Sequence, residues 1–160
     1  MQKWIRHLIL GVSALTSTVT LAATIANMNS PVGYWKTIDD VTNKPKSILQ
    51  VTETRDHTIM GRIIKIYPRP GYDQHELCTA CEGYRHNKPI VGMVIMQNLK
   101  QSEQGSAEWV DGEIMDPLNG KTYHCNFTVM NGGREAEVRG YIGLPLFGRS
   151  QTWFRVASPN

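Results

Sequence analysis

Beyond residue 30 the sequence consists mainly of short runs in which apolar and polar side chains alternate with a period of two. The run from Lys121 to Met130 is the clearest, and one of its faces carries Tyr123, Cys125, Phe127 and Val129. Successive side chains of a β-strand point to opposite faces, so this period is typical of strands with one buried face. No convincing helical period appears after residue 30. The alternation therefore predicts an all-β fold.

Eight such runs are separated by clusters of Gly, Pro, Asn and Asp, the residue types that favour tight turns. The predicted strands are residues 33–38, 47–54, 58–67, 91–99, 108–115, 121–130, 134–143 and 150–157. Asn131-Gly132-Gly133 is typical of a tight hairpin, and Asp116 to Gly120 of a second turn. Eight strands joined by hairpins predict an antiparallel up-and-down barrel, with a small sandwich as the alternative. Eight strands enclose either a filled core or one small ligand.

The segment from Pro68 to Pro89 has no strand pattern, and it contains two of the three cysteines. A connection of this length is usually functional or held by a cross-link. An odd number of cysteines allows at most one intramolecular disulfide. Cys125 could pair with Cys78 or with Cys81 and tether the segment to the barrel, or Cys78 and Cys81 could pair locally. A structural disulfide is the favoured interpretation, and the sequence leaves its pairing open.

The same cysteines have two other interpretations. His75, Cys78, Cys81 and His86 have a spacing that zinc could use, but disulfide formation competes with metal binding in an oxidising compartment. An active dithiol at Cys78 and Cys81 is disfavoured because no βαβ unit surrounds it. We therefore expect no metal site and no cofactor.

Residues 1–26 have the pattern of a secretory signal peptide, with Lys3 and Arg6 ahead of an apolar run from Leu8 to Leu21. Cleavage after Ala22 or Ala26 fits the small residues there, and residues 27–160 would form a single domain. The apolar run is shorter than the ~20 residues that span a bilayer, so we expect no stable membrane anchor. The sequence predicts a periplasmic or secreted protein of the Gram-negative type.

The whole chain has 17 Lys and Arg against 14 Asp and Glu. Two of the basic residues lie in the predicted signal peptide, so the rest of the chain has an excess of only one positive charge. A nearly neutral domain offers no general attraction for nucleic acid.

Candidate catalytic groups do not form a pattern. His57, His75, His86 and His124 are scattered, and no nucleophile-elbow motif is present. Asp39 and Asp40 are adjacent, but neighbouring side chains need not face each other, and the segment from Asp40 to Pro45 is typical of a polar turn. We expect the protein not to be an enzyme.

Arginine side chains are the remaining polar candidates. Arg139, Arg149 and Arg155 lie in otherwise apolar or aromatic surroundings, and Arg155 shares a strand face with Trp153. We interpret Arg155 as a structural clamp at one end of the barrel. The alternative is a partner for a ligand carboxylate, which suits the planar fork of Arg.

Six stretches carry a resemblance to a known family. They are GYWKTIDDVTNKPKS at 33–47, CTAC at 78–81, KPIVGM at 88–93, GEIMDPLNGKTY at 112–123, VRGYIG at 138–143 and FGRSQTW at 147–153. In this order they resemble an exported bacterial family catalogued as domain of unknown function 2147. The resemblance implies a lipocalin or calycin barrel. Gly33-Tyr34-Trp35 is similar to the lipocalin G-x-W signature, which implies that Trp35 packs at the closed end against Arg155, or else Arg149.

The leading functional hypothesis is binding of a small, partly apolar ligand, such as a fatty acid, in the barrel mouth. The candidate ligand-binding residues are Trp35, Met93, Tyr123, Phe127, Arg139 and Tyr141, with Met96 and Lys88 as further candidates. The alternative is a non-catalytic envelope protein with a filled core that acts through exposed residues at 68–72 and 143–147. Nothing in the sequence fixes the oligomeric state.

Overall fold

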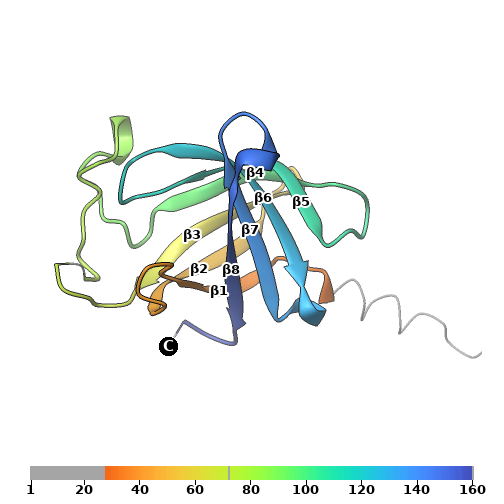
Figure 1. Cartoon of the computed structure of the whole chain (residues 1–160), viewed down its shortest axis with the longest axis horizontal. Coiled ribbons are helices and arrows are strands. Elements are labelled where there is room, and N and C mark those ends of the chain that lie inside the picture. The colour runs from red at the N-terminus through yellow and green to blue at the C-terminus, as the bar shows by residue number, and fades with distance from the viewer. Residues whose placement is uncertain (1–27, 72, 160) are drawn as a thin grey trace, which may run out of the picture.

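A closed barrel of eight antiparallel strands forms the protein in the computed structural model, which describes residues 28–71 and 73–159. The strands are β1 (Gly33–Ile38), β2 (Pro45–Glu53), β3 (Thr58–Ile66), β4 (Val94–Gln101), β5 (Glu108–Met115), β6 (Thr122–Met130), β7 (Glu135–Tyr141) and β8 (Arg149–Val156). Each strand pairs with its neighbour in the sequence, and β8 pairs with β1 to close the barrel (Figure 1). The predicted up-and-down barrel is confirmed. The predicted signal peptide, residues 1–26, lies outside the described residues.

The connections differ between the two ends of the barrel. At one end, short turns at 54–57, 102–107 and 131–134 join the strands. At the other end lie the segments 39–44, 67–93, 116–121 and 142–148, and we call this end the mouth. In Figure 1 the long segment 67–93 lies on the left of the barrel, and the turn after β4 lies on the right. No helix within the described residues has the length and apolar character needed to cross a membrane.

The closed end opposite the mouth is filled by aromatic side chains. Trp35, Phe127 and Trp153 are buried, and Phe127 contacts both tryptophans edge to face at centroid distances of 5.3 and 5.9 Å. The Trp35 indole donates a hydrogen bond to the carbonyl of Pro31 at 2.7 Å. Buried apolar side chains from all eight strands fill this end, and Val51, Ile59, Leu99 and Trp109 are among them, so the core is solid there.

Arg155 covers the aromatic cluster. Its guanidinium carbon lies 4.2 Å from the centre of the Trp35 ring, and Nη1 donates to the carbonyl of Val32 at 2.7 Å. The other guanidinium nitrogens donate to the carbonyls of Ser30 and Gly133. Burial lowers the pKa of Arg155, but an arginine stays protonated at neutral pH. Arg155, and not Arg149, therefore lies against Trp35.

The disulfide joins Cys78 to Cys81, with their Cα atoms 5.3 Å apart, while Cys125 is a buried free thiol. Of the pairings that the sequence left open, the structure has the local one. Both bridged cysteines are buried, and the Cys78 amide donates to the carbonyl of Lys88 at 2.9 Å. The long segment is therefore folded back on itself by a bond between its own residues and by backbone hydrogen bonds.

Candidate ligand-binding site

A cavity of about 320 Å³ opens at the mouth of the barrel. Its wall is mainly apolar and is contributed by β2, β3, β4, β5 and β7, through Leu49, Ile63, Ile66, Ile95, Ile114 and Val138. Trp153 also lines the cavity, whereas Trp35 and Phe127 do not. The interior is thus divided into a solid half at the closed end and a hollow half at the mouth.

Two hydroxyl groups are buried in the wall between β1 and β2. Thr37 and Ser47 are both buried, and their hydroxyl oxygens lie 2.8 Å apart in a hydrogen bond. The Ser47 amide also donates to the Thr37 hydroxyl at 3.2 Å. A buried hydroxyl is costly unless it has such a partner. The pair keeps a small polar spot in the apolar wall at little energetic cost.

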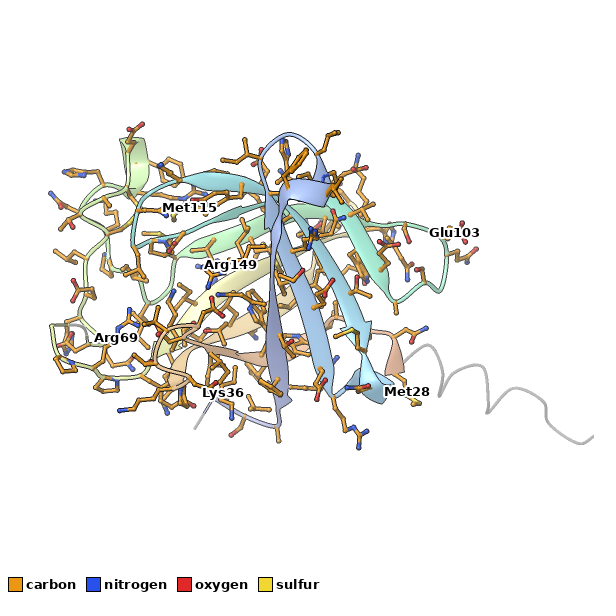
Figure 2. The ribbon with its side chains drawn as sticks, viewed as in Figure 1. Met28, Lys36, Arg69, Glu103, Met115 and Arg149 are labelled. Carbon is orange, nitrogen blue, oxygen red and sulfur yellow. A yellow bond between two sulfur atoms is a disulfide. The ribbon has the colours of Figure 1, made fainter. Side chains whose placement is uncertain are left out.

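The rim of the cavity carries a cluster of polar groups centred on Asp40. Arg149 and Gln151, both cavity-lining residues at the start of β8, donate hydrogen bonds to the same Asp40 oxygen, Oδ2. The Arg149 Nη2 to Asp40 Oδ2 distance is 2.6 Å. The Trp153 indole nitrogen donates to the Gln151 side-chain oxygen at 3.5 Å. Figure 2 shows Arg149 and Met115 on the Arg69 side of the barrel, away from Met28 and Glu103 at the opposite end.

Asp39 has different partners from its neighbour. Its Oδ2 forms an ion pair with Arg69 at 3.1 Å, and its Oδ1 accepts hydrogen bonds from the amide and hydroxyl of Thr42, both at 2.9 Å. The Thr42 backbone N–H, followed by its hydroxyl, holds the pKa of Asp39 below its usual value. Asp39 therefore orders the 39–44 turn from within, while Asp40 connects that turn to β8.

The turn after β5 presents Tyr123 to the cavity. Asp116 accepts hydrogen bonds from the Leu118 amide at 3.0 Å and the Asn119 side-chain amide at 3.2 Å. The Asn119 amide also donates to the Tyr123 hydroxyl at 3.2 Å. Both Asp116 oxygens are thus used within the turn, and the turn holds the phenol at the rim.

The comparisons with known proteins agree with this architecture. A family model described as "Uncharacterized protein conserved in bacteria (DUF2147)" matches residues 33–155, which include all eight strands except the last residue of β8. The chain belongs to the DUF2147 family. None of the curated proteins compared with it matches its sequence.

This DUF2147 chain is also similar to a solved structure described as "Protein HP1028 from the human pathogen Helicobacter pylori belongs to the lipocalin family". The TM-score is 0.67 at 18% sequence identity, and the match covers 81% of this chain and 84% of that chain. At this level of identity the likeness shows the fold alone. The DUF2147 barrel is lipocalin-like, as the resemblance in the sequence implied.

The structure places the predicted ligand-binding residues in four regions: the cavity, the solid half, an outer depression and the outer face of β7. Tyr123 lines the cavity, while Trp35 and Phe127 are buried in the solid half of the DUF2147 barrel, as is Met96. Met93 and Lys88 line a separate outer depression beside Tyr84. Tyr123 alone of these six candidates reaches the cavity.

Arg139 and Tyr141 lie on the outer face of β7. Their neighbours Val138 and Gly140 line the cavity, and the alternation of a strand sends the intervening side chains outward. Arg139 donates to the Pro145 carbonyl at 2.7 Å and to the Ser150 hydroxyl at 2.9 Å, and so holds the 142–148 segment. The Tyr141 ring lies 5.4 Å from the ring of His124. Neither side chain is placed to contact a ligand in the cavity.

The cysteine segment is not arranged for zinc. The sulfur atoms of Cys78 and Cys81 are bonded to each other, and a ring nitrogen of His86 bonds to the carbonyl oxygen of Cys81 at 2.9 Å. Among residues 28–71 and 73–159, no three His, Cys, Asp or Glu side chains gather into a possible metal site.

Sequence reasoning missed the Arg149–Gln151–Asp40 cluster and the Thr37–Ser47 pair. Part of the signal was present, because Gln151 shares a strand face with Trp153 and lies two residues before it. Nothing in the sequence indicated that Asp40 joins the cluster, because Asp40 lies 109 residues from Arg149 and contacts it only when β8 closes the barrel on β1.

Proposed function

We propose that this DUF2147 protein binds one small, partly apolar ligand in the mouth cavity and acts as a binding protein without catalysis. The observation that carries the proposal is the hollow of about 320 Å³, with an aliphatic wall and a polar rim. Small-molecule sites are mostly apolar, contain a few placed polar groups and occupy about 300 Å³ or more. The lipocalin-like fold supports the same function.

The divided interior limits the size of the ligand. The aromatic cluster of Trp35, Phe127 and Trp153 occupies the closed half of the barrel, so a bound chain cannot extend to that end. The cavity volume is at the lower end of the range for ligand sites. We therefore propose a fatty acid of medium chain length, or a lipid-like molecule of similar size, as the ligand.

Export to the periplasm or out of the cell is part of the proposal. It is supported by the signal-peptide pattern of residues 1–26 and by the disulfide between Cys78 and Cys81, because structural disulfides persist in oxidising compartments.

A cavity-filling substitution tests the binding function. Gly140 lines the cavity, and a Cβ added there would be 3.8 Å from both Ile114 and Tyr123, which is ordinary contact distance. Gly140→Leu should therefore fill the cavity without disrupting the strand. We expect the wild-type protein to bind a fluorescent medium-chain fatty acid, and Gly140→Leu to lower the affinity about tenfold or more, since a buried leucine occupies the space of several ligand methylenes.

Glu137→Leu is the matched control, because it adds the same side chain to the opposite face of β7. It should leave the affinity unchanged. Mass spectrometry of the purified protein should also detect a co-purified lipid. Absence of both fatty-acid binding and co-purified lipid would contradict the proposal, and so would equal affinities for wild type and a folded Gly140→Leu variant.

The exposed apolar segment after β7 favours a second candidate function, contact with a partner protein. The side chains of Ile142, Leu144, Leu146 and Phe147 are 64–79% exposed. Arg139 fixes the backbone beneath them through the carbonyls of Pro145 and Leu146. Cross-linking in periplasmic extract should then capture a partner with the wild type and lose it with Phe147→Ala. The other exposed segment predicted from sequence, 68–72, includes Tyr72, which lies outside the described residues.

A further inference from the structure

We propose that the polar end of the ligand is a carboxylate, and that it binds Arg149 and Gln151 by taking the place of Asp40. This inference rests on the proposed function and names the chemical class of its ligand: a medium-chain fatty acid in its ionised form. Asp40 then acts as a built-in competitor, which occupies the head-group position while the cavity is empty.

The geometry of the rim is that of a carboxylate site. Arg149 and Gln151 donate to one oxygen of Asp40, with the Arg149 Nη2 2.6 Å away. Convergent donors that include a guanidinium are the usual way in which proteins bind a carboxylate. Both donors belong to the wall of the cavity, whereas Asp40 comes from the 39–44 turn and is not part of that wall. The donors of the site therefore belong to the cavity wall, while the carboxylate that they bind comes from a turn outside that wall.

The Gln151 donor is oriented before any ligand arrives. Trp153 is buried, and its indole nitrogen donates to the side-chain oxygen of Gln151 at 3.5 Å. This hydrogen bond directs the Gln151 amide nitrogen away from the core and toward Asp40. Arg149 lies opposite Gly140 in the pairing of β7 with β8, which fixes the position of the Arg149 Cα atom. Groups already held in position bind a ligand without a further ordering cost.

The charge of the rim favours an anion once Asp40 has moved away. The charged residues that line the cavity are Lys46, Asp116 and Arg149. Asp116 has both oxygens hydrogen-bonded within its own turn. Among the described residues, the cavity wall therefore has two cations and one carboxylate, and a ligand carboxylate complements this wall better than a neutral or cationic head group.

Asp40 can leave Arg149 without unfolding the turn that carries it. The 39–44 turn is held by Asp39 through Thr42 and Arg69, and by the Asp39 amide, which donates to the Lys44 carbonyl at 2.9 Å. None of these bonds involves the Asp40 side chain. The Arg149 and Asp40 side chains are 71% and 33% exposed, and ion pairs open to water contribute little to stability. A rotation of the Asp40 side chain is sufficient for the exchange.

Calorimetric titration of the full-length protein with decanoate and with decanol at pH 8 tests the exchange, because the two probes differ only at the head group. We expect Asp40→Asn to strengthen decanoate binding about three- to tenfold by weakening the competitor, and to leave decanol binding unchanged. Arg149→Gln should weaken decanoate binding about tenfold, again without effect on decanol.

Asp39→Asn is the matched control, because it makes the same change of charge at the adjacent residue and keeps a side-chain oxygen for Thr42. It should change neither affinity. If decanoate and decanol respond alike to Asp40→Asn and Arg149→Gln, the head-group inference is overturned while the proposed binding function stands. If the wild type binds neither probe, the proposed function itself fails.

A second measurement does not depend on the variants. In ¹H–¹⁵N spectra of the wild type, decanoate should shift the backbone amides of residues 40–42, and decanol should not. Decanoate binding without movement of these signals would contradict the displacement of Asp40, even if a variant failed to fold.

Discussion

Arg155 joins β8 to two other segments of the closed end through one side chain. Its guanidinium donates to carbonyls that precede β1 and to Gly133 in the turn between β6 and β7, and it stacks on Trp35. Hydrogen bonds to a charged donor are stronger than neutral ones, and removing the donor leaves its acceptors without a partner.

We expect Arg155→Ala to lower the free energy of unfolding by about 3 kcal/mol. Arg155→Lys should recover only part of this loss, because an ammonium cannot reproduce the planar fork. Urea denaturation followed by tryptophan fluorescence measures both variants. A loss for Arg155→Ala within about 0.5 kcal/mol, the size typical of a surface substitution, would contradict the role of Arg155 as a clamp.

Cys125 is protected from chemistry by its burial. Desolvation raises the pKa of its thiol from 9.0 to about 12. We therefore expect iodoacetamide to modify no cysteine in the native protein at pH 8 and one cysteine after unfolding without reductant, as counted by mass spectrometry, because Cys78 and Cys81 are bridged.

The same shift predicts how stability depends on pH. Between pH 9 and about 12 the unfolded state binds fewer protons at Cys125 than the native state does. The contribution of this thiol therefore makes the native state less stable as pH rises through that window, by about 1.4 kcal/mol per pH unit, and has no effect below it. Cys125→Ala should remove this part of the alkaline slope, and an unchanged slope would show that Cys125 does not cause it.

At the scale of elements, the turn after β5 is packed directly against the disulfide segment. Gly120 has a φ of +72°, and a Cβ added there would lie 1.9 Å from the carbonyl oxygen of Ala80, between the two bridged cysteines. Any side chain at this position must therefore push the two segments apart. The contact couples one wall of the mouth to the long 67–93 segment.

We expect Gly120→Ala to reduce the free energy of unfolding by about 3 kcal/mol, from left-handed backbone strain and overpacking together. Gly105→Ala separates the two causes, because Gly105 has a similar φ of +79° and no atom within 4 Å of its added Cβ. Gly105→Ala should lower the free energy of unfolding by about 1 kcal/mol, measured by the same urea denaturation. Equal losses for the two variants would show that the contact with Ala80 carries no energy.

Most of the strand boundaries could be predicted from the sequence, because a strand with one buried face has alternating apolar and polar residues. The largest error was at β4, which begins at Val94 and not at residue 91. Gly92 has a φ of +94°, and the Met93 amide donates to the Ile90 carbonyl at 3.1 Å, so this stretch forms a turn of the mouth connection. Alternation cannot reveal a turn made by a glycine in an apolar run.

The candidate site was less predictable. In β7, alternation puts Val138 and Gly140 on the inner face and their neighbours on the outer face. Strict use of this pattern therefore excludes Arg139 and Tyr141 from the cavity. The Arg149–Asp40 contact depends on barrel closure across 109 residues, which no local pattern records. The local pairing of Cys78 with Cys81 likewise could not be chosen without knowing how the 67–93 segment folds in three dimensions.

At the scale of the whole molecule, the barrel is completed by pairing its first strand with its last. Tyr34 pairs with Val156 and Lys36 with Phe154, so native closure needs contacts between the two ends of the described chain. Folds dominated by such distant contacts fold slowly, because loop closure costs entropy before the contacts form.

We expect refolding from urea to take milliseconds to seconds. The buried residues Trp35, Trp109 and Trp153 report it through stopped-flow fluorescence. Recovery of the complete native signal within microseconds would contradict a folding step limited by barrel closure.

The unequal connections at the two ends of the barrel have a consequence for how such a protein can diversify. Among the short turns, 131–134 contains Gly133, whose carbonyl accepts a hydrogen bond from Arg155, so an insertion there would disturb the packing of the solid half. The four mouth segments surround the hollow half, and added length there costs little closure entropy. Selectivity can therefore be re-engineered by grafting new mouth segments onto an unchanged scaffold.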